Sequence, residues 1–165
     1  MNPRIKKTTY RKKTRELLIR LIFQMASMED FSEGEKDRYL ADSSLYIGDV
    51  REDLPPGCIF DETKGEKPDL PYLNRCFTCV REHLREIDDL IERASDKWKV
   101  ERMSAVDLAI LRVAVAELLY IDEIEDSVSV NEAVLLAKKY GSEKSAVFIN
   151  GVLGKVARSR SEGGT

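Results

Sequence analysis

Residues 105–120 constrain the fold more than any other part of the chain. Their apolar side chains recur at helical spacing and cover almost the whole circumference of the predicted helix. A helix that is apolar nearly all round is buried, so this segment is expected at the centre of the core. Ser104 stands just before it and has capping-box spacing with Asp107, which predicts the start of the helix.

Helical periodicity also appears in five other segments, and no segment shows the alternation typical of a strand. The Ser129 and Glu132 pair predicts a second capping box, and Gly141 and Ser142 predict the end of one helix and the start of the next. The fold is therefore predicted to be all-α, with six or seven helices. Besides 105–120, the predicted helices cover residues 11–28, 32–46, 73–91, 129–141 and a last segment from 142 to beyond 156.

Residues 49–71 interrupt this pattern, because they contain four of the five prolines of the chain. The segment is predicted to be a loop or a partly mobile insertion, and Gly48 is predicted to end the helix before it. A chain of 165 residues is most simply one domain.

Charge is distributed unevenly along the chain. Residues 1–20 contain eight lysines and arginines against Glu16 alone, so they carry +7 while the remainder carries −10. Such a basic segment on an acidic protein predicts a local anion-binding surface, with nucleic acid as the first candidate. A solubilising tail is the alternative, but Tyr10 among the charges and their continuation into a helix favour binding.

The sequence offers little for catalysis. His83 is the single histidine, and no Gly-x-Ser-x-Gly or phosphate-binding glycine motif is present. Three cysteines are an odd number, which favours a reducing cytoplasm over a disulfide framework. No apolar run approaches the roughly 20 residues that span a bilayer, and the basic start lacks the apolar region of a secretory signal. We therefore expect a cytoplasmic protein that is not an enzyme and has no cofactor.

One group of residues raises the question of a zinc site. Cys76, Cys79 and His83 follow helical spacing, and Cys58 lies upstream, so four ligands of suitable type are available. Ligand pairs usually lie on a turn rather than in the middle of a helix. We therefore expect Cys76 and Cys79 to be small core residues and predict no metal.

Four strings in the chain resemble the NusB family of bacterial transcription antitermination factors. Two lie in the C-terminal part, NEAVLLAKKYGSEKS (131–145) and FINGVL (148–153). The others are DLAILRVAVAEL (107–118) and the basic opening RKKTRE (11–16). The C-terminal strings are highly specific, and the basic opening is supportive.

The resemblance implies a NusB-like fold of two small helical bundles within a single domain, residues 1–165. The expected parts are an N-terminal subdomain (8–92, with the insertion 49–71), a C-terminal subdomain (93–158) and a frayed tail (159–165). It also implies that the protein binds the boxA element of nascent ribosomal RNA with NusE, a small-subunit ribosomal protein. The complex would join RNA polymerase and suppress termination.

The matching positions imply which residues perform this function. A basic and aromatic set would contact RNA, and Glu101 and Asp107 would face the basic NusE. The aromatic members could instead be core residues, and a stacked aromatic contributes about 1–3 kcal/mol per base. The implied RNA-binding residues are Arg11, Lys12, Lys13, Arg15, Arg20, Phe23, Lys144 and Phe148.

Other interpretations remain open at this stage. The basic segment could bind an acidic protein, which would make the chain a helical interaction module without RNA binding. A related helical domain also occurs ahead of an RNA cytosine methyltransferase domain, but a chain ending at Thr165 is not expected to carry one. The resemblance allows either a monomer or a homodimer. Arg112 and Glu117, within the apolar helix, are expected to form structural ion pairs or caps, with contact to a partner as the alternative.

Overall fold

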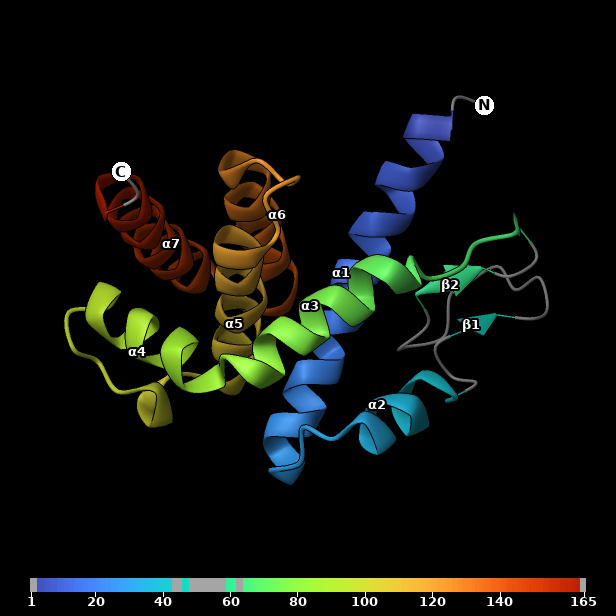
Figure 1. Cartoon of the computed structure of the whole chain (residues 1–165), viewed down its shortest axis with the longest axis horizontal. Coiled ribbons are helices and arrows are strands. Elements are labelled where there is room, and N and C mark those ends of the chain that lie inside the picture. The colour runs from blue at the N-terminus through green and yellow to red at the C-terminus, as the bar shows by residue number, and fades with distance from the viewer. Residues whose placement is uncertain (1–2, 43–45, 48–58, 62–63, 164–165) are drawn as a thin grey trace. The chain divides into compact units, whose positions relative to one another are not determined.

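The computed structural model of the chain describes residues 3–42, 46–47, 59–61 and 64–163. Seven α-helices account for most of these residues, so the predicted all-α fold is confirmed (Figure 1). The exception is a parallel pair of two-residue strands in which Tyr46 pairs with Phe60. The elements are α1 (Pro3–Met28), α2 (Glu33–Leu40), β1 (Tyr46–Ile47), β2 (Phe60–Asp61), α3 (Leu70–Glu82), α4 (Leu84–Ala94), the 3-10 helix η3 (Val100–Arg102), α5 (Ala105–Tyr120), α6 (Asp126–Tyr140) and α7 (Glu143–Gly163).

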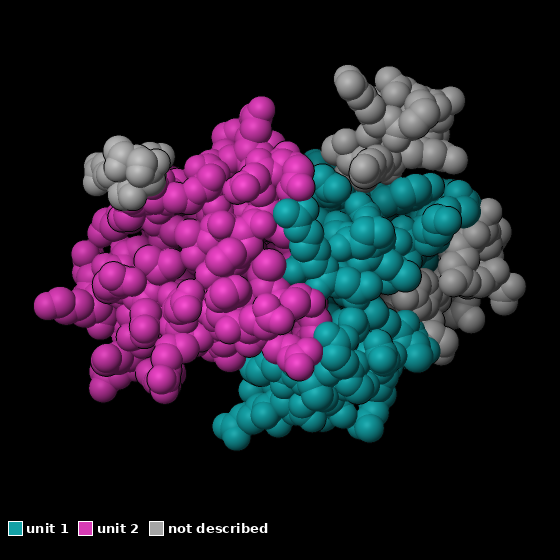
Figure 2. All heavy atoms as spheres, in the orientation of Figure 1, with its two compact units in different colours: residues 1–75 teal, residues 76–165 magenta. Residues whose placement is uncertain are grey.

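The chain divides into two compact units, residues 1–75 and 76–165, which Figure 2 distinguishes by colour. The boundary between these units lies within α3. The subdomains 8–92 and 93–158 implied by the resemblance stay a prediction. The first unit contains α1, α2 and the strand pair. The second contains α4 to α7.

Helix α5 is the core of the second unit. Ten consecutive residues, Ala109 to Leu118, are buried, as expected for a helix that is apolar nearly all round. Helices α4, α6 and α7 each pack against it. They contribute buried aliphatic residues such as Ile87 of α4, Ala137 of α6 and Leu153 of α7.

Two predicted helix ends are confirmed by their hydrogen bonds. Ser104 is the N-cap of α5, and its hydroxyl accepts a hydrogen bond from the Asp107 N–H at 3.0 Å. Gly141 ends α6, and a Cβ there would lie 2.9 Å from the Ala137 carbonyl oxygen, so the position favours glycine. Ser142 then precedes α7, and its hydroxyl accepts from the Ser145 N–H at 3.2 Å.

The predicted capping box at Ser129 is wrong. Helix α6 begins three residues earlier, at Asp126, after Glu125 in an extended conformation. The acidic side chain of Asp126 in the first turn favours that start. Ser129 is only 1% exposed and lies inside the helix.

The first helix is longer than predicted. It begins at Pro3, a residue preorganised for the first position of a helix, and not at Arg11. Arg11 is therefore more than two turns from the start of the helix.

Two other helices are shorter than predicted. Helix α2 ends at Leu40, and the chain reaches β1 by Tyr46, so Gly48, which lies outside the described residues, does not end it. The predicted helix 73–91 is broken at His83, which has non-helical dihedral angles and separates α3 from α4. Its ring stacks on Tyr120 of α5 at 4.3 Å.

At the C-terminus, α7 continues to Gly163, so residues 159–163 are helical where a frayed tail was expected. No helix in the described part of the chain is long and apolar enough to cross a membrane.

The cap at Ser104 leads to a prediction about stability. Replacing Ser104 with Ala removes the acceptor for the Asp107 N–H and should lower the free energy of unfolding by about 0.5–2 kcal/mol. Urea unfolding followed by circular dichroism measures this. Ser104→Asp retains an acceptor and should remain near the wild-type value; equal losses in both variants would show that the cap is not the cause.

Candidate nucleic-acid interface

Three of the predicted RNA-binding residues share one side of α1. Lys12, Arg20 and Phe23 are separated by eight and three residues, which places them close together around the helix axis. Lys12 is exposed, Phe23 is 38% exposed, and Arg20 pairs with Glu16 at 3.7 Å. From Lys12 to Phe23 the helix rises about 16 Å, a length that several nucleotides of an extended strand could follow.

Two other cations of the basic opening, Arg11 and Lys13, are held by residues 65–69. Lys13 forms a short ion pair with Glu66, and Arg11 lies 3.6 Å from Asp69. The Thr14 hydroxyl accepts a hydrogen bond from the Asp69 N–H at 2.8 Å. These contacts attach the segment to α1 and partly neutralise its charge.

The Tyr72 ring contacts two arginines that were predicted to contact RNA. The guanidinium carbons of Arg11 and Arg15 lie 5.3 and 5.5 Å from the centre of its ring. Arg15 is 3% exposed, so its guanidinium lies within the protein and not on its exposed surface. Its contact with RNA stays a prediction, whereas its packing against Tyr72 is present in the structure.

The contacts of Glu66 also change its acidity. Burial raises the pKa of this carboxyl, but hydrogen bonds from Lys13 and from the Asp61 N–H at 2.8 Å lower it more, and the net pKa is lowered. The ionised form of Glu66 therefore stabilises the first unit.

The second unit carries the other predicted RNA-binding residues on α7. Lys144 is exposed in the first turn, and Phe148 is half-buried one turn later. The Phe148 ring meets Trp98 at 5.5 Å with the planes inclined at 66°, an edge-to-face contact. Phe148 is therefore partly exposed, and its ring contacts a second aromatic side chain.

Sequence reasoning missed Trp98. The signal was present, because the only tryptophan of the chain lies between Lys97 and Lys99 in a short link between two helices. Aromatic residues beside lysines are typical of surfaces that bind single-stranded nucleic acid.

The two predicted NusE-facing residues differ in accessibility. Glu101 is exposed on η3. Asp107 is 9% exposed, and its Oδ2 accepts a hydrogen bond from the Ser145 hydroxyl at 3.3 Å. Its Oδ1 is buried without a hydrogen-bond partner among the described residues. Both roles stay predictions.

Two charged residues of α5, Arg112 and Glu117, are buried within the protein. Arg112 forms two hydrogen bonds to the Asp88 carboxylate, at 2.9 and 2.8 Å, as expected for a structural ion pair. Glu117 is 1% exposed, so it does not present its charge to solvent.

Cys76 is buried and Cys79 is partly buried, both as free thiols on α3. Within the described ranges, no group of three or more His, Cys, Asp and Glu side chains could hold a metal ion. Cys58 lies outside the described residues.

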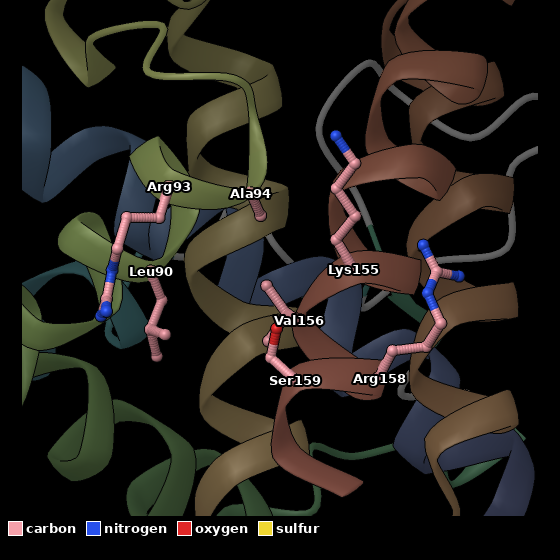
Figure 3. A pocket seen from close by; sticks show the side chains of 7 residues that line it. All are labelled: Leu90, Arg93, Ala94, Lys155, Val156, Arg158 and Ser159. Carbon is pink, nitrogen blue, oxygen red and sulfur yellow. The ribbon is translucent and has the colours of Figure 1, made fainter. Parts of the chain in front are cut away.

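A groove of about 310 Å³ lies between α4 and α7. The residues that line it are Leu90, Arg93, Ala94, Lys155, Val156, Arg158 and Ser159. Figure 3 shows these two arginine side chains extending away from each other. The groove therefore does not gather its cations around a single anion.

An all-helical fold with basic and aromatic helix faces is characteristic of a small nucleic-acid-binding protein. The family model for the NusB family matches residues 12–158, and the chain belongs to this family.

Sequence relatives agree with this assignment. The transcription antitermination protein NusB of Clostridium botulinum strain Hall is 40% identical over 148 residues, covering 88% of this chain and 98% of that protein. NusB of Natranaerobius thermophilus is 36% identical over 147 residues, covering 89% and 94%.

Solved structures share the fold. NusB of T. maritima aligns with a TM-score of 0.65 at 29% identity, covering 89% of both chains. A chain from a crystal structure of the antitermination factors NusB and NusE in complex with double-stranded RNA aligns at 0.68 and 23% identity. It covers 91% of this chain and 97% of that chain, and at this identity the likeness shows the fold alone.

The Glu66 contacts predict an acid-dependent loss of stability. Because the folded pKa is lowered, the contribution is present above the unfolded value of 4.5 and is lost as pH falls through the folded pKa. Glu66→Gln should lower the neutral-pH free energy of unfolding by about 0.5–1 kcal/mol. It should also reduce the further loss of stability below about pH 4.5.

Urea unfolding at a series of pH values tests this. Glu82→Gln, an exposed change at the end of α3, leaves the Glu66 contacts intact and should keep the wild-type acid dependence. An identical acid dependence in Glu66→Gln and wild type would contradict the assigned role of Glu66.

Proposed function

We propose that the protein is a transcription antitermination factor that binds the boxA element of nascent ribosomal RNA together with NusE. Family membership supports this role, since the related NusB proteins are named as antitermination proteins. The main observation in its support is that Lys12 and Phe23 lie on one exposed face of α1. Such a face can neutralise phosphates and stack an unpaired base without covalent chemistry.

The RNA contacts are proposed to differ among the residues of the basic opening. Lys12 is exposed and supplies a phosphate contact on α1, and Phe23 supplies a stacking surface. Arg11 and Lys13 reach RNA only in competition with Asp69 and Glu66. Lys144 and Phe148 form a second contact on α7.

NusE is the proposed protein partner. NusB and NusE occur together with double-stranded RNA in the crystal structure that shares this fold. Here the exposed carboxylate of Glu101 offers an acidic contact for a basic ribosomal protein. Assembly with RNA polymerase in the cytoplasm is a further part of the proposal, and the protein could act as a monomer or form a homodimer.

A second candidate is a helical interaction module that binds only proteins. The internal ion pairs of Arg11 and Lys13 favour it, because they reduce the positive charge that RNA would meet. This candidate predicts no selective RNA binding even with NusE.

Fluorescence anisotropy distinguishes the two candidates. Labelled boxA-like RNA, a scrambled RNA and a boxA duplex are titrated with and without NusE at two salt concentrations. Antitermination function predicts that NusE tightens binding to single-stranded boxA RNA selectively, whereas equal and weak binding to all three RNAs would demote the protein to an interaction module.

The exposure of Lys12 leads to a sharper prediction than replacing the whole basic opening, since Arg15 is buried and its removal would perturb folding. Lys12→Ala should weaken RNA binding at low salt and reduce the slope of log K against log salt by about 0.7. Lys138→Ala, an equal change of charge on the exposed surface of α6, is the control. An equal change of slope in both variants would mean that Lys12 acts only through net charge.

A further inference from the structure

Trp98 has the exposure of a binding residue and not that of a core residue. It is 48% exposed, although a large aromatic side chain gains from burial. One edge contact joins it to Phe148 at 5.5 Å. Much of the indole ring is therefore available to a flat ligand.

The link that carries Trp98 is held in a strained and well-fixed conformation. Asp96 and Lys97 both have positive φ, at 57° and 66°, which is unfavourable for residues with a side chain. The Lys97 N–H donates a hydrogen bond to the Glu92 carbonyl oxygen at 2.9 Å. The Ser95 hydroxyl donates another to the Trp98 carbonyl oxygen at 3.2 Å. Strain of this kind persists where surrounding contacts impose it, and it occurs often at ligand sites.

The link is attached to one face of α7. Lys144, Phe148, Gly151 and Lys155 follow one another at intervals of four, three and four residues, so they share this face. Trp98 contacts Phe148, and the Lys155 ammonium lies 3.1 Å from Asp96. The two aromatic rings therefore lie between two basic side chains on one side of α7.

Gly151 has no structural reason to be glycine. A Cβ at this position would meet no atom within 4 Å, and the residue is exposed in the middle of a helix. Alanine would favour the helix more than glycine does. The missing side chain therefore leaves the backbone of α7 open to close approach from outside the protein.

We propose that this face of α7, with Trp98, is a track for single-stranded RNA in which an unpaired base stacks on Trp98 and the strand passes over Gly151. The inference rests on the proposed RNA-binding function and extends it to a residue not assigned before. Lys144 and Lys155, one on each side, neutralise phosphates of the same strand, and Lys155 does so in competition with its ion pair to Asp96.

The charges beside Trp98 favour RNA over an apolar peptide. Lys97 and Lys99 flank the indole ring in the chain, and the Lys99 side chain is 68% exposed although its ammonium lies 3.7 Å from the Glu92 carboxylate. An apolar peptide would gain nothing from these ammonium groups, whereas a sugar–phosphate backbone would. The fixed link also avoids the entropic cost of ordering the indole ring upon binding.

Because Trp98 is the only tryptophan, its fluorescence reports on this site directly. Titration of the full-length protein with single-stranded boxA-like RNA at low salt, without NusE, should quench the emission with the same midpoint as the anisotropy. Trp98→Ala should weaken binding about 5- to 150-fold, whereas Trp98→Phe should retain most of the affinity because it keeps a ring. Leu135→Ala removes an exposed apolar side chain from a different helix, α6, and should bind as wild type.

Gly151→Ala separates a binding effect from damage to the fold. The added methyl group should raise the thermal midpoint by about 2 °C through its helix propensity, yet it should weaken RNA binding several-fold. Greater stability with lower affinity cannot arise from unfolding. Unchanged affinity in this variant would show that the strand does not pass over Gly151 and would overturn the track.

The remaining outcomes distinguish the inference from the function on which it rests. If wild type binds boxA-like RNA selectively but Trp98 emission does not change and Trp98→Ala binds within twofold, the track is wrong and the antitermination role stands. If Trp98→Ala loses binding only to NusE, the indole contacts protein, which also overturns the track. If wild type shows no RNA binding even with NusE, both proposals fail.

Discussion

The burial of α5 is the constraint on which the second unit depends. A helix with ten consecutive buried residues has no face left for solvent, so neighbouring helices must cover it on several sides. Helices α4, α6 and α7 do this, and each keeps its charged side chains outward. Arg112 and Glu117 are the charged residues of this buried run, and the two hydrogen bonds of Arg112 to Asp88 join α4 to α5 with defined geometry. The exposed faces of α4 and α7 can then vary without disturbing the core.

Sequence patterns predicted the fold class and the best-capped helix ends, because those depend on local chemistry. Ser104 and Gly141 act within one turn of the helices that they limit, so their roles could be read directly. Predictions failed where tertiary contacts decided the outcome. Ser129 has the composition of a cap but is buried within α6, and His83 breaks a continuous helical pattern beside its stacking partner on α5.

The candidate site was only partly predictable for a related reason. Spacing identified the basic and aromatic residues of α1, but it could not show that Tyr72, about 60 residues away, lies against Arg11 and Arg15. Spacing also could not show that the Trp98 ring, in the link after α4, contacts the Phe148 ring on α7. Residue type is encoded locally, whereas exposure and pairing depend on segments that are distant in the chain. A list of cations from sequence alone therefore overstates how many of them face solvent.

The ion pairs of Lys13 with Glu66 and of Arg11 with Asp69 have a consequence for thermodynamics. These carboxylates act as built-in counterions. When an RNA phosphate takes the place of a carboxylate, the cation exchanges one fixed anion for another and few dissolved ions are released. The entropy gained from released ions is then smaller than the number of lysines and arginines suggests, so binding should tolerate changes in cellular ionic strength better than a fully exposed basic helix would.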